Sequence, residues 1–219
     1  FVFGAGGDRF LIDPGYGASA TKQHNAVTVR GADQVVKAVA PIYRVREFDG
    51  GFYLACDLTA AAPHVLVTHT RHLLLVDEAH LLVVDLLEAR HGGRVGANIH
   101  LQTRFPCQRT PSGVRLEGAE RSLLVQPLIP VTPIETEDWD WRGLSATTIS
   151  WRPVVDRQRE CHAMLLSLED CEAAFAVKEN IAELRLNNTS HRIDLVEAAP
   201  VPGGSPETRG FSPPASFAG

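Results

Sequence analysis

The sequence has no excess of basic residues and no long apolar run. Its 219 residues include 21 Lys and Arg against 26 Asp and Glu, which gives a formal net charge of −5. Sequence-independent nucleic-acid binding needs patches of Lys and Arg that neutralise phosphates, so this balance argues against it. A membrane-spanning helix needs about 18 consecutive apolar residues, whereas the longest apolar run, Leu81–Leu87, is broken by Asp85. We therefore expect no nucleic-acid partner and no membrane span.

Methionine is nearly absent. The chain opens on Phe1, and Met164 is its single methionine. No basic segment followed by an apolar one is present, so no signal peptide is visible. Because the alternation of apolar residues starts at Phe1, the chain is predicted to begin inside a strand. We expect a mature or truncated C-terminal piece of a longer protein; the alternative is a complete processed protein.

The sequence also lacks the spacing of well-known chemical motifs. It contains no P-loop, GxGxxG, HExxH or GxSxG, so phosphoryl transfer, hydride transfer and α/β-hydrolase chemistry lose their usual signatures. Its four cysteines have no CxxC spacing, which excludes a zinc knuckle and a thioredoxin-type motif. Cys161 and Cys171 could face each other across a hairpin, but four free thiols are an equal alternative. Cysteine usage therefore does not decide the compartment.

Period-2 alternation of apolar residues dominates what is present, and no amphipathic helix exceeds about two turns. The chain is 44% hydrophobic, enough for a sizeable core. About fourteen short strands are too many for a small single barrel and favour stacked sheets. We predict an all-β fold, a large antiparallel β-sandwich of two stacked sheets over residues 1–199. Residues 200–219, rich in Pro, Gly and Ser, are predicted to form a disordered tail.

Turn-forming residues separate the predicted strands. Gly6-Gly7-Asp8 joins the first two as a hairpin, and Pro41 interrupts the fourth, because proline cannot donate to a ladder. The predicted strands are Phe1–Ala5, Arg9–Ile12, Ala26–Arg30, Val35–Phe48, Phe52–Leu58, His64–Val76, His80–Leu87, Val95–Phe105, Val114–Glu117, Ser122–Pro127, Ala146–Trp151, His162–Ser167, Ala173–Lys178, Ile181–Leu186 and His191–Val196.

The hairpin of His64–Val76 with His80–Leu87 is the clearest element of the pattern. Arg71 lies on an otherwise apolar face and, if buried, needs Asp57 or Asp85 as a partner. His69 and His72 are three residues apart and must point to opposite faces of a strand, which favours ordinary sheet histidines over a cluster. The predicted core residues of this hairpin are Val65, Val67, Leu73, Leu75, Leu82 and Val84.

A small polar constellation near the N-terminus is the candidate site. Asp13 ends a strand and enters a Pro-Gly turn, while His24 and Asn25 immediately precede the next strand. A carboxylate and an imidazole that converge at two strand ends suit Zn²⁺. Two ligands are too few, so a third would have to come from elsewhere. The alternative is that Asp13 caps its turn and His24 is an exposed loop residue.

His100 and the tryptophans are further candidates. His100 is predicted in mid-strand and would belong to a site only if its face lines a groove. Trp139, Trp141 and Trp151 could stack on sugar rings, although core packing is the commoner use of tryptophan.

Several stretches, taken in order, resemble one family. They are Phe1-Val2-Phe3, Phe10–Gly15, His24–Gly31, Tyr53–Thr59, Arg71–Val76 with Leu82–Asp85, and Asn98–His100. In this order and spacing, over roughly residues 1–130, the chain resembles the C-terminal β-sandwich domain of the heparinase II/III-like polysaccharide lyases.

The resemblance implies β-elimination on uronic-acid polysaccharides. A base takes the proton α to the uronate carboxylate, a general acid protonates the leaving glycosidic oxygen, and an unsaturated sugar remains. The carboxylate must be neutralised for the carbanion-like state to form. In the family, an N-terminal α/α toroid domain supplies an Asn, a His and a Tyr for this work. The sandwich adds a His and often a Tyr, and it holds a structural zinc ion.

Carried over to this sequence, the resemblance makes Asp13 and His24 two ligands of a structural Zn²⁺. The third family ligand comes from a stretch that would lie upstream of Phe1. Tyr16 is the counterpart of the sandwich tyrosine and a candidate general acid. Asn25 is expected to fix the loop that carries the ligands. On these grounds this chain alone is expected to be an incomplete lyase.

Two functions follow from this interpretation. The first is the C-terminal domain of a lyase acting on an acidic polysaccharide, with the α/α toroid of the same chain as its partner. The alternative is a non-catalytic carbohydrate-binding or scaffold module that kept the fold. The resemblance also implies a periplasmic or secreted location.

Overall fold

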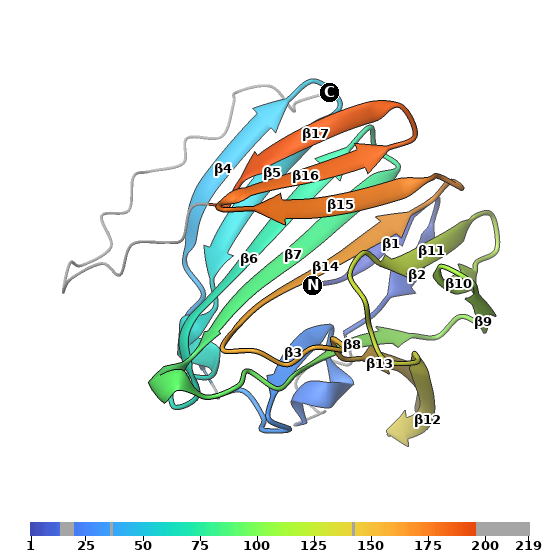
Figure 1. Cartoon of the computed structure of the whole chain (residues 1–219). Helices are drawn as coiled ribbons and strands as arrows, with labels where there is room; N and C mark the ends of the chain where they lie inside the picture. The colour runs from blue at the N-terminus through green and yellow to red at the C-terminus, as the bar shows by residue number, and fades with distance from the viewer. Residues whose placement is uncertain (14–19, 36, 142, 196–219) are drawn as a thin grey trace, which may run out of the picture.

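The computed structural model describes residues 1–13, 20–35, 37–141 and 143–195, which fold into layered β-sheets (Figure 1). Within these ranges every helical element is a three-residue 3₁₀ turn: η2 (Thr21–Gln23), η3 (Thr59–Ala61) and η4 (Arg90–Gly92). None of the described helices is long and apolar enough to cross a membrane. The predicted tail at 200–219 lies outside the described residues.

An eight-stranded antiparallel sheet forms the centre of the molecule. The predicted hairpin of β6 and β7 lies in its middle, and β4 and β9 are its two edges. In spatial order the strands are β4 (Ile42–Phe48), β5 (Gly51–Asp57), β6 (Leu66–Val76), β7 (His80–Ala89), β14 (Arg159–Ser167), β11 (Ser122–Pro127), β10 (Gly113–Glu117) and β9 (Cys107–Thr110).

Three smaller antiparallel sheets accompany the central one. The first is the predicted N-terminal hairpin of β1 (Phe3–Ala5) and β2 (Asp8–Leu11). The second has four strands in the order β12 (Glu135–Trp141), β13 (Leu144–Trp151), β8 (Ala97–Thr103) and β3 (Ala26–Val29). The third is the meander of β15 (Ala173–Lys178), β16 (Ile181–Leu186) and β17 (Thr189–Asp194).

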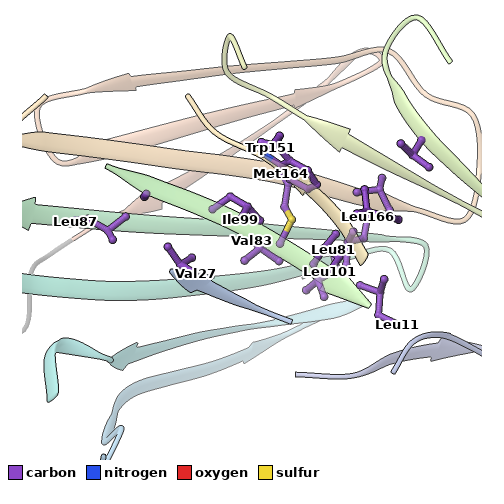
Figure 2. Close-up of a cluster of buried hydrophobic side chains, with 14 of the residues drawn as sticks. Leu11, Val27, Leu81, Val83, Leu87, Ile99, Leu101, Trp151, Met164 and Leu166 are labelled. Carbon is purple, nitrogen blue, oxygen red and sulfur yellow. The ribbon is translucent and has the colours of Figure 1, made fainter. Parts of the chain in front are cut away.

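The central sheet carries a hydrophobic core on each face, because side chains alternate along its strands. In the first core Val83 meets Ile99 and Trp151 of the four-stranded sheet (Figure 2). In the second core Val84, the next residue of β7, packs with Leu184 beneath the β15–β17 meander. The predicted antiparallel all-β sandwich is confirmed, and the structure adds a third layer to its two predicted sheets.

The β6–β7 hairpin follows the predicted register except at its start. Leu82 and Val84 are fully buried, as predicted. Val67 is 44% exposed, so its predicted burial is wrong. The cause is a register shift between Leu66 and Thr68, which places Leu66 in the core instead, as a β-bulge does. The remaining predicted core residues are half-buried against the first core: Val65, Leu73 and Leu75.

The long predicted strand Val35–Phe48 is also shorter in the structure. Only β4, from Ile42 onward, pairs with β5. Pro41 accepts one last hydrogen bond, from the Asp57 N–H at 2.9 Å, but it has no N–H with which to extend the ladder. Val35 and Val39 are exposed on the connection that precedes it.

All four cysteines are free thiols. Cys161 lies on β14 and Cys171 just after it, and no bond joins them. Burial raises the pKa of the Cys161 thiol to about 12 and that of Cys107 to about 11. Both thiols are therefore protonated at neutral pH and weak as nucleophiles or metal ligands.

Candidate functional site

Asp13 and His24 come together on the side of the central sheet that carries the four-stranded sheet. Asp13 follows β2, and the preceding Ile12 N–H donates to the Gln102 carbonyl of β8 at 2.9 Å. His24 ends η2 and leads into β3. The His24 Nδ1 and the Asp13 Oδ2 are 3.0 Å apart, and both side chains are partly exposed, at 29% and 39%. The structure thus brings together two segments eleven residues apart.

The donor set of this pair fits part of a zinc site. Zinc bonds to imidazole nitrogen and carboxylate oxygen are about 2.0–2.2 Å long, which places neighbouring ligand atoms of a tetrahedral ion about 3.4 Å apart. The 3.0 Å separation is close to that spacing. Among the described residues, no group of three His, Cys, Asp or Glu side chains is arranged to hold a metal ion. Asp13 and His24 can therefore supply two ligands of a larger set, and their metal-binding role stays a prediction.

Asn25 joins the segments around this pair. Its side-chain amide donates to the Phe1 carbonyl at 2.6 Å and to the Ile12 carbonyl at 2.8 Å. Its side-chain oxygen accepts from the Gln102 N–H at 2.7 Å. The buried side chain of Asn25, directly after His24, thus connects three other segments. They are the start of the chain, the residue before Asp13, and strand β8.

Gln102 extends this network into the four-stranded sheet. Its side-chain nitrogen donates to the Lys22 carbonyl at 2.7 Å, and its side-chain oxygen accepts from Thr148 at 2.8 Å and from the Trp139 indole at 3.0 Å. Gln102 could not be singled out from the sequence, because no pattern distinguishes a glutamine in a strand that connects several segments from any other. Trp139 is half-buried, and Trp151 packs in the first core.

A groove of about 880 Å³ runs along the N-terminal hairpin and reaches Asp13. Arg9 of β2 and Arg104, which follows β8, both line it, with Phe3 and Phe105 supplying apolar surface. Two guanidinium groups beside apolar rings can bind carboxylate or sulfate groups of a ligand. Tyr16, the candidate general acid, lies outside the described residues.

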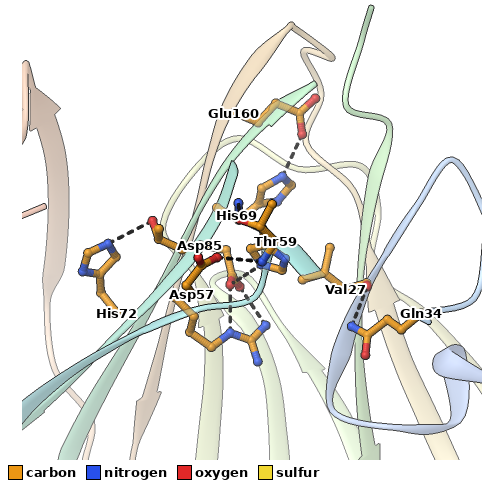
Figure 3. Close-up of polar contacts among 11 residues, drawn as sticks. Val27, Gln34, Asp57, Thr59, His69, His72, Asp85 and Glu160 are labelled. Atoms are coloured by element: carbon orange, nitrogen blue, oxygen red, sulfur yellow. Dashed lines mark hydrogen bonds and ion pairs between the residues drawn. The ribbon is translucent and has the colours of Figure 1, made fainter. Parts of the chain in front are cut away.

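Arg71 forms a buried ion pair with Asp85, one of its two predicted partners. Its Nε and Nη2 donate to the two carboxylate oxygens at 2.8 and 2.9 Å, and His69 Nε2 donates to the same carboxylate at 3.0 Å. Figure 3 shows His69 and Asp85 pointing toward each other in the interior. The other predicted partner, Asp57, accepts from the Thr59 N–H at 2.8 Å.

Glu160 and His162 form a second buried pair, at 2.8 Å, which was not predicted from the sequence. The available signal was their i, i+2 spacing in a strand, which places both on one face. His162 lies opposite Asp85 in the pairing of β7 and β14. These two clusters pair most of the buried charged side chains between the sheets with a partner, so we assign these side chains a structural role.

The mid-strand histidines are core residues. His72 points to the second core, away from His69, and its Nδ1 is 2.7 Å from the Tyr53 hydroxyl. His100 Nε2 is 2.9 Å from the Thr28 hydroxyl. Burial lowers the pKa of each histidine to about 4, with help from Arg44 at His72 and from Lys22 at His100. Both are neutral at pH 7.

Comparison with known proteins identifies the family of this domain. The family model described as heparinase II/III-like, C-terminal, matches residues 1–140. The chain belongs to this family. No curated protein matches the sequence of this heparinase II/III-like domain.

Solved structures of a heparan sulfate lyase and of a heparinase share the fold. The heparan sulfate lyase HepC from Pedobacter heparinus aligns over 88% of this chain with a TM-score of 0.67 and 14% identity. Heparinase III aligns over 85% with a TM-score of 0.61 and 16% identity. The heparinase II/III-like domain spans only 36% and 34% of the lengths of these two proteins, so the alignments establish its fold alone.

Proposed function

We propose that this domain is the C-terminal part of a polysaccharide lyase that cleaves an acidic, uronate-containing polysaccharide by β-elimination. Membership of the heparinase II/III-like family supports it, and two neighbours in fold carry the name heparan sulfate lyase. The observation that carries the proposal is the Asp13–His24 pair at the end of a groove lined by Arg9 and Arg104.

In this proposal most of the named residues of the domain bind the polysaccharide or hold the site in place, and few take part in the chemical step. Arg9 and Arg104 attract the carboxylates or sulfates of the polymer. Asn25 holds the Asp13 and His24 segments together through its three hydrogen bonds. Bound Zn²⁺, held by Asp13, His24 and a ligand upstream of Phe1, would stiffen this corner against the N-terminal α/α toroid.

The chemical step needs groups from two domains. The toroid neutralises the uronate carboxylate and supplies the base that takes the α proton. The electron pair of that C–H bond forms the new C=C bond as the glycosidic C–O bond breaks. Tyr16 is the proposed acid that protonates the departing oxygen. We propose that the protein is periplasmic or secreted, because a lyase of this kind encounters its polysaccharide outside the cytoplasm.

Zinc analysis of two proteins tests the metal site. This chain is expected to bind zinc weakly, and a longer protein with the upstream segment is expected to bind it stoichiometrically. In the longer protein, Asp13→Asn or His24→Gln should abolish tight binding, whereas the exposed His64→Gln should not. Stoichiometric zinc in this chain alone, or full zinc in the Asp13 and His24 variants, would contradict the assignment.

Activity is tested on the longer protein with heparan sulfate, alginate and chondroitin. Cleavage should appear as the ultraviolet absorbance of the unsaturated uronate, and Tyr16→Phe should reduce kcat more than KM. A longer protein that holds zinc, binds a uronate polymer and cleaves none of the three would favour the alternative, a carbohydrate-binding module.

A further inference from the structure

A second groove, of about 690 Å³, lies between the edge strand β4 and strand β17. Tyr53 and Leu74 of the central sheet lie at its base. Arg44, Arg46 and Phe48 come from β4, and Ser190–Asp194 come from β17. None of these residues lines the groove at Asp13, and the two grooves lie on opposite faces of the central sheet.

Strand register explains why two arginines of β4 face this groove. Arg46 pairs with Tyr53 across β4 and β5, and Arg44 pairs with Ala55. Paired residues share a face, and Tyr53 and Ala55 both bury into the second core under the β15–β17 meander. The arginines of β4 therefore point to the face where the meander lies, whereas Arg192, next to the buried Ile193, lies on the outer face of β17 and lines the groove at its rim.

The groove is basic in an acidic protein. Its lining holds three arginines and one aspartate, Asp194, while the whole chain carries a net charge of −5. Arg192 is 3.9 Å from Glu183, but both side chains are well exposed, at 75% and 45%, and such pairs contribute little. A ligand anion can therefore replace Glu183 at small cost.

The base of the groove is preorganised. The Tyr53 hydroxyl lies 2.7 Å from His72 Nδ1 and 3.5 Å from the Asp194 carbonyl, which ties β5, β6 and β17 together. Burial raises the pKa of the Tyr53 hydroxyl, a shift opposed by the nearby guanidinium of Arg44. Its positive charge also contributes to the lowered pKa of His72, which is the effect expected of a cation facing this space.

We propose that the groove between β4 and β17 binds an acidic oligosaccharide segment, at a site separate from the Asp13–His24 groove. Guanidinium groups bind carboxylate and sulfate through paired hydrogen bonds. Phe48, 41% exposed, offers an aromatic ring to the apolar face of a sugar. The volume is within the range of about 300–1,000 Å³ typical of ligand sites. The choice of an acidic glycan rests on the proposed function, and the site would hold the polymer away from the point of cleavage.

Binding to this chain by isothermal calorimetry tests the site. The probes are a heparin-derived tetrasaccharide, tetragalacturonate and the neutral maltotetraose. Both acidic probes should bind better than maltotetraose, and comparing them distinguishes sulfate from carboxylate recognition. The double variant Arg46→Gln with Arg192→Gln should weaken acidic binding about tenfold or more, the effect of losing hydrogen bonds between charged groups.

Two further variants make the result decisive. Arg109→Gln removes an exposed arginine from β9, the opposite edge of the same sheet, and should leave binding unchanged. Arg104→Gln removes charge from the Asp13 groove. Binding that is lost in Arg104→Gln and kept in the double variant would overturn the proposal, as would equal binding of maltotetraose. Thermal unfolding of each variant confirms that the fold is intact.

The outcome separates this inference from the proposed function. If the longer protein cleaves a uronate polymer while this chain shows no binding dependent on Arg46 and Arg192, only the inference fails. If the groove binds acidic probes and the longer protein cleaves none, the lyase proposal fails and the groove stands.

Discussion

Asp85 is buried between Arg71 and His69, on the face of β7 that meets the first core. Replacing it by Asn keeps the shape of the side chain but leaves the Arg71 guanidinium buried without a counter-charge. Breaking a buried pair in this way costs about 3–5 kcal/mol. We therefore predict that Asp85→Asn lowers the free energy of unfolding, measured in urea, by that amount.

Glu88, on the same strand, is the matched control. It pairs at 2.9 Å with Arg159, and the Glu88 and Arg159 side chains are 18% and 72% exposed, so solvent reaches this pair from the arginine side. Glu88→Gln should change the free energy of unfolding by about 1 kcal/mol or less. Equal effects of the two substitutions would show that the fully buried pair contributes no more to stability than the partly exposed one.

His72 and His100 should make stability depend on pH. Each has a folded pKa of about 4, below its ordinary value of 6.5, mainly because of burial. Between these values the unfolded chain binds more protons, so stability rises with pH across this window and is lost as pH falls from about 6.5 to 4. The loss is up to about 3 kcal/mol for each histidine.

Urea unfolding from pH 7 to pH 4.5 measures this effect. His72→Gln and His100→Gln should each flatten the dependence, and the exposed His64→Gln controls for the change of one histidine. If the free energy of unfolding of the wild-type protein did not change with pH in this window, His72 and His100 would not be buried in the neutral form.

Asp85 affects stability at a lower pH. Arg71 and His69 hold the pKa of its carboxyl far below the usual range, so its contribution to stability is lost only in stronger acid.

At the scale of the element, the bulge in β6 decides which residues support the core. Leu82→Ala on β7 should cost about 2–5 kcal/mol, because Leu82 is fully buried in the second core. Val67→Thr at the bulge should change stability by about 0.5 kcal/mol or less, because Val67 faces solvent. Thermal or urea unfolding compares them, and a larger loss at Val67 would restore the register predicted from the sequence.

Several elements could be predicted because their information is local. The Gly6-Gly7 turn has positive φ at both glycines and joins β1 to β2 as expected. The β6–β7 hairpin pairs Val76 with His80 around a short connection. The bulge between Leu66 and Thr68 could not be predicted, because the adjacent Leu66 and Val67 are both apolar and either could take the inward position.

At the scale of the whole molecule, the three layers predict where the fold is most stable. Strands β6, β7 and β14 are central in the eight-stranded sheet and covered on both faces. Their amides should exchange with solvent most slowly, and those of the edge strand β4 fastest within the same sheet.

Hydrogen exchange followed by mass spectrometry checks this order. β9, the other edge strand, should resemble β4 and not β7. Slow exchange in β4 equal to that in β7 would mean that the edge is covered in solution by another chain or segment.

The candidate site divides between local and tertiary information. Asp13, His24 and Asn25 could be singled out because a turn follows one strand and precedes the next. The structure places Asp13 and His24 3.0 Å apart. The role of Gln102, which holds both Asn25 and Trp139, could not be predicted, since it depends on β8 lying between β3 and β13.

The sequence by itself determined most of the strands, though not β9 or β12, and it determined the all-β class, the partner of Arg71 to within two carboxylates, and the family resemblance. These follow from alternation, turn residues and motif order, which are read along the chain. Only the tertiary structure decided that the central sheet is covered on both faces and that the β4 arginines face β17. Period-2 alternation gives every strand two faces but does not say which sheet packs on each, because that depends on contacts between residues far apart in sequence.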